Sequence, residues 1–367
     1  MLPPTTQNHQ TVSKRHPIIQ EDIVRIVGND LPWSRFARKT VLVSGANGFL
    51  PACMVETLAY LNETEMQPKC RIIALVRNQE KAQKRFAHLL GRPDFSLLVQ
   101  DVCAPITLDG ELHMIIHAAS QASPKYYGKD PVGTLSANSL GTHNLLSVGR
   151  QHRIENFLFF SSGDVYGRSS TPETPTKEDE YGYLDPTDLR SCYGESKRLG
   201  ENMCISWSHQ YGIPVKIVRP SHTYGPGMAL DDGRVFADFV ANVVRHENII
   251  IKSRGTAIRP FCYVADAALG YFTVLLKGGN REAYNVGNED VNLSVAELAR
   301  LLVDLFPERK LRVIIQPDFV QEDGYMKSPV ERASLDTSKL RSLGWRPSTA
   351  ANDGFRRTVL SYESGDS

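Results

Sequence analysis

The chain has 367 residues, a formal net charge of +1, and a composition of 41% hydrophobic and 23% charged residues. This length gives room for a large core and about two lobes, and the balanced charge gives no reason to expect nucleic acid or an anionic membrane as a partner. No apolar run approaches the ~20 residues of a membrane span, and the six scattered cysteines lack CxxC or metal-ligand spacing. We therefore expect a cytoplasmic protein with reduced thiols and without a metal site.

Residues 1–38 precede the first predicted strand and form an N-terminal extension. Within it, Glu21–Val27 predicts a short helix that ends at Gly28. The extension could pack on the neighbouring lobe or on a second subunit, but our expectation is a passive surface appendage.

A strand, a glycine turn and a helix follow each other directly after the extension. Val41–Ser44 predicts a buried strand, Gly45–Leu50 the turn, and an apolar-periodic segment through Leu61 the helix. Glycines here let the backbone approach a pyrophosphate, and the helix N-terminus offers it unpaired N–H groups. Pro51 replaces the third glycine of the general fingerprint and suits a first helical turn. The alternative is an ordinary glycine turn without a ligand.

The second predicted strand, Arg71–Val76, leads into an arginine where an NAD site normally carries an acidic residue. Arg77 could receive the 2′-phosphate of NADP, or it could stack on adenine while NAD binds. Asp101, which follows the third predicted strand, is expected to reach the adenine. The choice between the two dinucleotides stays open on these residues.

Strands alternate with helical stretches from Lys39 to about residue 220, which predicts a Rossmann-type α/β fold with a doubly wound parallel sheet. We assign 39–220 to an NAD(P)-binding domain. The alternation weakens over 221–367, where we expect a smaller C-terminal substrate lobe whose segments interleave with the first. The predicted strands lie near 41–44, 71–76, 97–100, 113–117, 157–161 and 215–218.

Polar side chains follow the predicted strand that begins at Phe157. Ligands of open parallel sheets bind at the carboxyl ends of the strands, and Ser162 and Asp164 lie there. Ser162 could hydrogen-bond a substrate hydroxyl or its oxidised carbonyl, and Asp164 could act as a base nearby. The alternative is that both side chains only cap the following turn.

A tyrosine and a lysine one helical turn apart follow a long loop over 167–191, of a length that is usually functional. Tyr193 and Lys197 point the same way on a helix and can share one wall of a site. An ammonium nearby favours the phenolate, so the pair predicts a base that removes a proton from an alcohol near neutral pH.

Together these motifs resemble the extended short-chain dehydrogenase/reductase family, in the branch that acts on nucleotide-diphosphate sugars and includes UDP-glucuronate decarboxylases and dTDP-glucose 4,6-dehydratases. The resemblance runs from about Lys39 to the C-terminus. Further matching segments are His117–Ser120, Asn138–Thr142, Arg219–Pro226, Arg259–Asp266, Tyr284–Gly287, and Asp336–Lys339 with Leu343–Trp345.

The resemblance implies a nucleotide-diphosphate sugar as substrate, a homodimer, and bound NAD, because enzymes that recycle their cofactor within one turnover usually keep NAD; NADP is the alternative. It implies the catalytic residues Ser162, Asp164, Tyr193 and Lys197. It implies cofactor contacts from Gly45, Asn47, Gly48, Phe49, Leu50, Arg77, Asp101, Val102, Ala118, Ala119, Ser120, Tyr193 and Lys197. It implies substrate contacts from Asn138, His222, Arg234, Arg259 and Arg332.

Two of these substrate residues have alternatives. Arg259 suits a diphosphate, because the guanidinium fork matches phosphate oxygens, whereas an interlobe salt bridge is the other interpretation. His222 stands where relatives usually carry asparagine, which could report a different substrate or a structural histidine at a lobe interface.

The reaction implied by the resemblance begins with oxidation at sugar C4, in which Tyr193 accepts the proton, supported by Lys197 and Ser162. A 4,6-dehydratase would carry an adjacent Asp-Glu pair where this chain has Gly163 and Asp164. Loss of carbon dioxide from a 4-keto uronate needs no leaving-group acid, so a decarboxylase fits better, although Asp164 is one methylene shorter than the usual glutamate.

Three other functions stay open at this stage. They are a 4-epimerase, an NADPH-consuming 4-keto-sugar reductase favoured by Arg77, and a non-catalytic sugar-nucleotide sensor. The complete set of Ser162, Tyr193 and Lys197 argues against the sensor.

Overall fold

Seven parallel strands form the central sheet of the computed structural model, which describes residues 15–64, 66–168, 174–316 and 334–363. The strands lie in the order β10-β6-β5-β4-β1-β2-β3, and every neighbouring pair is parallel. This topology confirms the predicted Rossmann-type α/β fold. The strands are β1 (Thr40–Ser44), β2 (Arg71–Val76), β3 (Phe95–Val99), β4 (Met114–His117), β5 (Asn156–Phe160), β6 (Val215–Pro220) and β10 (Glu282–Val286).

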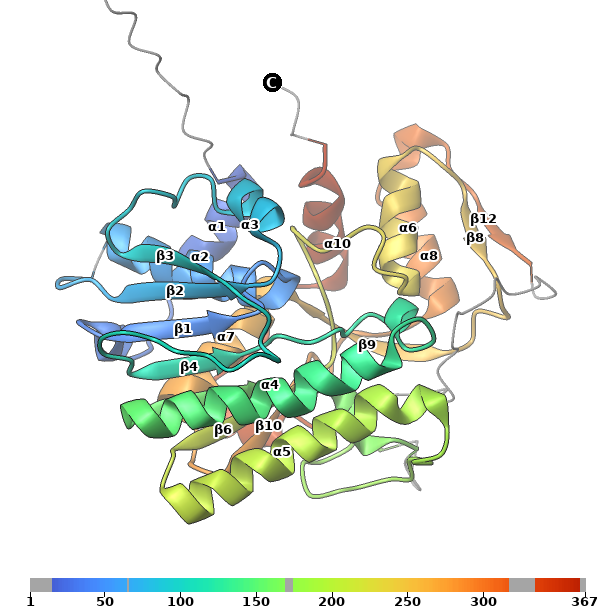
Figure 1. The fold of residues 1–367 in the computed structure, drawn as a ribbon. Helices are drawn as coiled ribbons and strands as arrows, with labels where there is room; N and C mark the ends of the chain where they lie inside the picture. Colours follow the sequence, from blue (N-terminus) through green and yellow to red (C-terminus); the bar gives the residue numbers. More distant parts are fainter. Residues whose placement is uncertain (1–14, 65, 169–173, 317–333, 364–367) are drawn as a thin grey trace, which may run out of the picture.

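Both faces of this sheet are buried, because successive side chains of a strand point to opposite faces and helices cover each one. Val41 and Val43 of β1 join an apolar cluster with three helices, whereas Leu42 joins a second cluster with two others. The latter pair, α4 and α5, runs side by side along the sheet (Figure 1). The first face is covered by α1 (Pro17–Val27), α2 (Phe49–Thr64) and α7 (Val264–Lys277), and the second by α4 (Pro131–His152) and α5 (Cys192–Tyr211).

The edge strand β10 shows how the two lobes interleave. It follows residue 220 by about sixty positions in the chain, yet it pairs with β6 from Glu282↔Lys216 to Val286↔Pro220. The sequence pattern does not predict β10, because the alternation of predicted strands and helices is weak after residue 220. The chain thus leaves for the C-terminal lobe and returns to the sheet, as the interleaved fold class requires.

The C-terminal lobe combines short strands with helices. A three-stranded sheet has the order β11-β9-β7, and β12 pairs with β8 beside α6 and α8 (Figure 1). None of the helices among the described residues is long and apolar enough to cross a membrane. The remaining elements are α3 (Gln79–Arg85), β7 (His222–Tyr224), α6 (Val235–Val244), β8 (Ile249–Ile251), β9 (Ile258–Tyr263), β11 (Asn292–Ser294), α8 (Val295–Asp304), β12 (Val313–Ile315), α9 (Ser338–Ser342), α10 (Ala351–Leu360) and five short 3-10 helices at 33–36, 124–126, 163–166, 189–191 and 307–309.

The N-terminal helix α1 is part of the core, so the expectation of a passive appendage is wrong. Ile23 is fully buried between α2 and α7. The buried carboxylate of Asp22 accepts hydrogen bonds from the Tyr263 hydroxyl (2.6 Å) and from the Arg357 guanidinium of α10 (2.9 Å). Burial raises the pKa of Asp22 against the opposing effect of these two partners. The extension therefore packs on the cofactor lobe and connects it to the C-terminal helix; residues 1–14 lie outside the described part of the chain.

Candidate functional site

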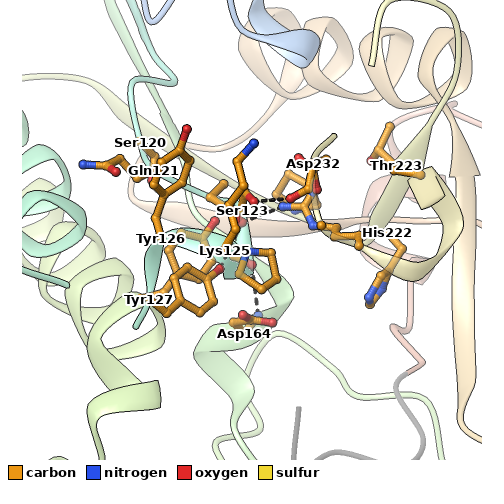
Figure 2. A pocket seen from close by; sticks show the side chains of 18 of the residues that line it. Ser120, Gln121, Ser123, Lys125, Tyr126, Tyr127, Asp164, His222, Thr223 and Asp232 are labelled. Carbon is orange, nitrogen blue, oxygen red and sulfur yellow. Dashed lines mark hydrogen bonds and ion pairs between the residues drawn. The ribbon is translucent and has the colours of Figure 1, made fainter. Parts of the chain in front are cut away.

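The carboxyl ends of the parallel strands open into a cleft of about 2200 Å³ between the two lobes. This is the edge at which ligands of open parallel sheets bind. One wall comes from the glycine turn, the segments after β4 and β5, and the start of α5; the other comes from β7, β9 and the start of α6. Figure 2 shows the segment from Ser120 to Tyr127 on one side and His222 with Thr223 on the other.

The glycine turn after β1 is fixed by close backbone contact. Gly45 has φ +65°, and a Cβ there would lie 2.7 Å from the Cα of Ala119 in the segment after β4. Gly48 donates its N–H to the Gly45 carbonyl at 2.7 Å, and α2 begins at the next residue, so its free N–H groups face the cleft. Pro51 is buried in the first turn of that helix. The turn has the geometry that a pyrophosphate needs.

Three serine hydroxyls support a ligand in this cleft. The Oγ atoms of Ser120, Ser161 and Ser221 are buried, line the cleft, and have no hydrogen-bond partner among the described residues. Buried hydroxyls are normally hydrogen-bonded, so these atoms fit the polar groups of a dinucleotide or a sugar. The predicted cofactor residues Gly45, Asn47, Gly48, Phe49, Leu50, Arg77, Asp101, Val102, Ala118, Ala119 and Ser120 all line the cleft.

Arg77 and Asp101 face each other at the dinucleotide end of the cleft. Their nearest charged atoms are 3.9 Å apart, and the two side chains are 71% and 46% exposed. A carboxylate beside the arginine offsets the attraction that a bare guanidinium would have for a 2′-phosphate. This pairing favours the two free hydroxyls of an NAD ribose over the phosphate of NADP.

The turn after β5 carries Ser162 and Asp164 into the cleft. Ser162 caps the short helix at 163–166, because its Oγ accepts the Asp164 N–H at 3.1 Å, so the capping interpretation holds for this side chain. The same hydroxyl lies on the Tyr193 side of the cleft and acts to lower the pKa of that phenol. Asp164 is exposed in the cleft, on the Tyr127 side in Figure 2. A Cβ on Gly163 would meet only ordinary contacts, the nearest at 3.5 Å from the Pro220 carbonyl.

Tyr193 and Lys197 lie on the first turns of α5, and both are buried. The Tyr193 ring stacks on Tyr127, with centroids 5.2 Å apart and planes at 16°. Lys197 donates to the Phe160 carbonyl at 2.6 Å, and its ammonium lies 5.8 Å from the Tyr193 ring centroid. Burial lowers the pKa of Lys197 to about 7.

The prediction that Lys197 lowers the pKa of Tyr193 is wrong for this structure. Burial, and next the Asp164 carboxylate, raise the pKa of Tyr193 to about 12. The opposing groups are the Arg234 guanidinium and the Ser162 hydroxyl. The cation that favours the phenolate therefore comes from the other lobe, through Arg234.

Arg234 lies at the N-terminal end of α6 and reaches across the cleft. Its guanidinium donates to the Ala122 carbonyl at 2.6 Å and lies 3.4 Å from the Asp232 carboxylate. Ser123 donates to the Asp232 carbonyl, which closes the same contact between the lobes (Figure 2). The arginine thus holds the substrate lobe to the segment after β4 while it faces Tyr193.

Two other predicted substrate residues line the cleft on β7 and β9. His222 lies between the edges of Phe236 and Phe261, with ring centroids 6.2 and 6.1 Å away. Burial, followed by the charges of Arg259 and Arg234, lowers the pKa of His222 to about 3, so the ring is neutral at neutral pH. Arg259 lines the cleft beside it.

Asn138 does not line the cleft, so its predicted contact with substrate is wrong. It is fully buried on α4 and donates from Nδ2 to the Ser196 hydroxyl at 2.9 Å, behind the helix that carries Tyr193. Arg332 lies outside the described residues.

Sequence reasoning missed two cleft residues that have specific contacts. Tyr127 stacks on Tyr193, and Arg85 donates to the Asn47 carbonyl of the glycine turn (3.3 Å) and to the Gly227 carbonyl of the other lobe (3.0 Å). Neither residue belongs to a sequence motif, and the contacts of both are with residues that are distant in the chain, so the sequence gives little indication of them. The only sequence signal was the position of Tyr127 in the loop that follows the His117–Ser120 segment.

A model of the NAD dependent epimerase/dehydratase family matches residues 41–287. The chain is 30% identical over 317 residues to UDP-glucuronic acid decarboxylase 3 of Arabidopsis thaliana, which covers 86% of each protein. It also resembles the solved UDP-glucose 4-epimerase of Thermotoga maritima (TM-score 0.74, 22% identity, 89% of this chain and 99% of the other). A dTDP-glucose 4,6-dehydratase of Streptomyces venezuelae, solved with NAD, gives a TM-score of 0.74 at 23% identity over 89% of this chain and 97% of the other.

The two solved structures support the fold, while the family model and the decarboxylase support the wider assignment. The match covers the glycine turn, the turn after β5 and the Tyr193–Lys197 segment, which are the parts of the chain that build the cleft. This chain belongs to the NAD dependent epimerase/dehydratase family.

Proposed function

We propose that this enzyme is a nucleotide-sugar decarboxylase that acts on UDP-glucuronate or a close relative and retains NAD through the turnover. The observation that carries the proposal is the turn after β5. It offers one carboxylate, Asp164, and no acid at Gly163, while Arg234 faces the same point from the other lobe. A uronate needs a cation for its carboxylate, and its chemistry needs no acid for a leaving hydroxyl.

The first step is oxidation of the C4 hydroxyl, in which Tyr193 removes the proton. Bound NAD supplies the acceptor for the hydride from C4 and later the donor that returns it. Ser162, which lines the cleft beside Tyr193, holds the oxygen as it becomes a carbonyl. Arg234 stabilises the phenolate that Tyr193 must form. Stacking on Tyr127 keeps the phenol ring in one orientation.

The second step breaks the bond between C5 and C6 of the 4-keto sugar. The electron pair moves towards the C4 carbonyl, carbon dioxide leaves, and a proton is then added at C5. Arg234 is suited to orient the C6 carboxylate, because a guanidinium binds a carboxylate with two parallel hydrogen bonds. Asp164 is suited to control the proton at C5, from the other side of the cleft.

The nucleotide end of the substrate fits the lobe formed by β8, β9 and α6. Arg245 and Arg259 line the cleft there, together with Lys252 and Arg254, and supply positive charge for a diphosphate. The NAD assignment for this chain draws on the pairing of Arg77 with Asp101. Retained NAD and a basic nucleotide lobe are common to decarboxylases and 4-epimerases, so they do not decide between these reactions.

The test is incubation of the purified protein with UDP-glucuronate, UDP-glucose and dTDP-glucose, followed by mass spectrometry of the products. We expect loss of carbon dioxide from UDP-glucuronate without added reductant. Loss of water from dTDP-glucose would assign a dehydratase, and an unchanged mass with a new sugar would assign an epimerase. In a separate incubation with a nucleotide 4-keto sugar and NADPH, gain of two hydrogens with matching consumption of NADPH would assign a reductase and contradict the proposal.

We also propose a homodimer built on α4 and α5. Apolar side chains are exposed on these two helices: Val132 is 69% exposed, Leu140 54% and Leu199 48%. A patch of this kind on neighbouring helices is typical of a protein interface. The six free cysteines agree with the cytoplasmic location that the composition predicts.

A further inference from the structure

A chain of buried hydrogen bonds begins at the glycine turn. The Ser44 hydroxyl, at the end of β1, accepts the N–H groups of Ala118 and Ala119, both at 3.2 Å. Its own proton is then directed to Nδ1 of His117, 2.8 Å away. Ser44 and His117 are at most 1% exposed. The segment that lines the dinucleotide end of the cleft is therefore tied to a buried histidine.

The same chain continues through α4 to the helix of the base. Nε2 of His117 lies 3.0 Å from the Thr142 hydroxyl, which donates to the Asn138 carbonyl at 2.6 Å. Asn138 donates from its side chain to Ser196 (2.9 Å), and Ser196 donates to the Tyr193 carbonyl (2.9 Å).

Every bond in this chain has the same direction. Thr142 uses its proton on Asn138, so His117 must donate to it from Nε2–H and accept from Ser44 at Nδ1. Ser44, His117 and Thr142 each donate through a group that also accepts, so these three polarise one another. At Asn138 the chain passes from the backbone carbonyl to the separate side-chain amide, so from there to the backbone of Tyr193 the link is one of position. Burial, and next Lys197, lower the pKa of His117 to about 3. The ring stays neutral, because a second N–H on it would leave the Ser44 proton without an acceptor.

A second path leads from His117 to Lys197. The Phe159 ring lies 5.6 Å from the His117 ring, and the Lys197 ammonium lies 5.0 Å from the centroid of the same phenyl ring. Gly200 of α5 packs directly against Phe159, where a Cβ would clash. His117 therefore contacts the supports of both active-site residues of α5.

From these contacts we infer that His117 is a positioning residue, which holds Tyr193 and Lys197 in register with the glycine turn through the relay Ser44–His117–Thr142–Asn138–Ser196. The relay crosses from the cofactor-binding turn to the proton-accepting helix without entering the cleft. It fixes the distance between the two ligand-binding walls that hydride and proton transfer require.

The test cuts the relay at Thr142. Thr142→Val keeps the shape and removes the hydroxyl, whereas Thr142→Ser keeps the hydroxyl. Thr358→Val is the matched control, because Thr358 is also fully buried and also donates to the carbonyl four residues earlier at 2.6 Å, but on α10. A purely structural role predicts a loss of thermal stability in both valine variants, larger in Thr142→Val because it leaves the His117 N–H unpaired, and no change at Tyr193.

The first readout needs no turnover. In full-length protein with ¹³Cζ-labelled tyrosine, the Tyr193 signal is assigned by its loss in Tyr193→Phe. We expect this signal to shift or broaden in Thr142→Val and to stay in place in Thr142→Ser and Thr358→Val. An unmoved signal in Thr142→Val would overturn the inference. Ser196→Ala, which removes the last bond of the relay, gives the same readout if the valine variant does not fold.

The second readout rests on the proposed function. Single-turnover formation of reduced nicotinamide with UDP-glucuronate is expected to slow ~10-fold or more in Thr142→Val at unchanged KM, and to stay within about twofold in Thr142→Ser. Equal rates in the two variants would overturn the inference. If the wild-type protein forms no reduced nicotinamide with UDP-glucuronate, the proposed function fails, and the Tyr193 signal still decides the inference.

Discussion

Two turns at the same edge of the sheet differ in how much freedom their glycines have. Gly45, after β1, has a positive φ and backbone atoms of Ala119 where a side chain would begin. Gly163, after β5, has only ordinary contacts at that position. Close backbone packing therefore prevents change where the dinucleotide is expected, whereas the turn that we propose to face the sugar can accept a side chain. In this chain, a side chain can therefore be added after β5 with less strain than after β1.

The largest effect is expected when the phenol beside the turn after β5 is removed. Tyr193→Phe keeps the ring stacked on Tyr127 and loses only the proton acceptor. We expect turnover to fall by ~10³-fold or more, with NAD and nucleotide sugar still bound. Rate assays and calorimetric titration measure the two properties separately. Near-normal turnover would reject Tyr193 as the base.

The comparison itself is tested by adding one methyl group to each turn. Gly45→Ala should cost roughly 2–5 kcal/mol of unfolding free energy, because it adds a left-handed alanine to an overpacked contact, and should lose bound dinucleotide. Gly163→Ala should stay within about 0.5 kcal/mol. Chemical denaturation and the absorbance of the purified proteins report both effects. Equal costs at the two positions would contradict the comparison.

Asp164→Asn tests whether the variable turn does chemistry after C4 oxidation. The change keeps the volume and removes the charge that raises the pKa of Tyr193. We expect product formation to fall by ~10²-fold while reduced nicotinamide accumulates, because the first step no longer leads to a completed second one. Full activity would make Asp164 a turn residue only.

Acid should lower the free energy of unfolding through two histidines, His117 buried behind the cleft and His222 in its wall. The folded chain holds His117 and His222 neutral, with pKa values of about 3, whereas an unfolded histidine titrates near ~6.5. The unfolded chain therefore binds more protons between these limits, and the free energy of unfolding falls as pH drops below ~6.5. Urea titrations between pH 7.5 and 5.5 measure the slope, and His222→Gln should reduce it. A flat profile would show that these rings are not held neutral.

The smallest effect is expected at Arg77, which lines the cleft beside Asp101. Arg77→Ala should weaken NADPH binding only a few-fold more than NADH binding, because Asp101 already partners the guanidinium. Fluorescence titrations with both dinucleotides compare the losses. A large loss confined to NADPH would restore the reductase hypothesis.

The sequence predicts those parts of the fold and of the site whose residues are neighbours in the chain. The strand, turn and helix over 41–61 and the Tyr193–Lys197 spacing involve neighbours in the chain, so they could be recognised in advance. The arrangement of partners could not: Arg234 reaches Tyr193 from a residue 41 positions later, and Tyr127 approaches it from the segment after β4. The buried position of Asn138 and the return of β10 to the sheet likewise depend on packing between distant segments.

The ion pair between α1 and α10 has a consequence for how this protein is made. Asp22 is among the first described residues to leave the ribosome, and its partner Arg357 follows 335 residues later. Until then the carboxylate lacks the guanidinium that donates to it, so the layer of the core around α1 stays incomplete until α10 has been synthesised. A chain released before α10 would keep the Asp22 carboxylate beside Tyr263 with Arg25 as the cation that still acts on it. Synthesis of α10 thus completes the packing around α1.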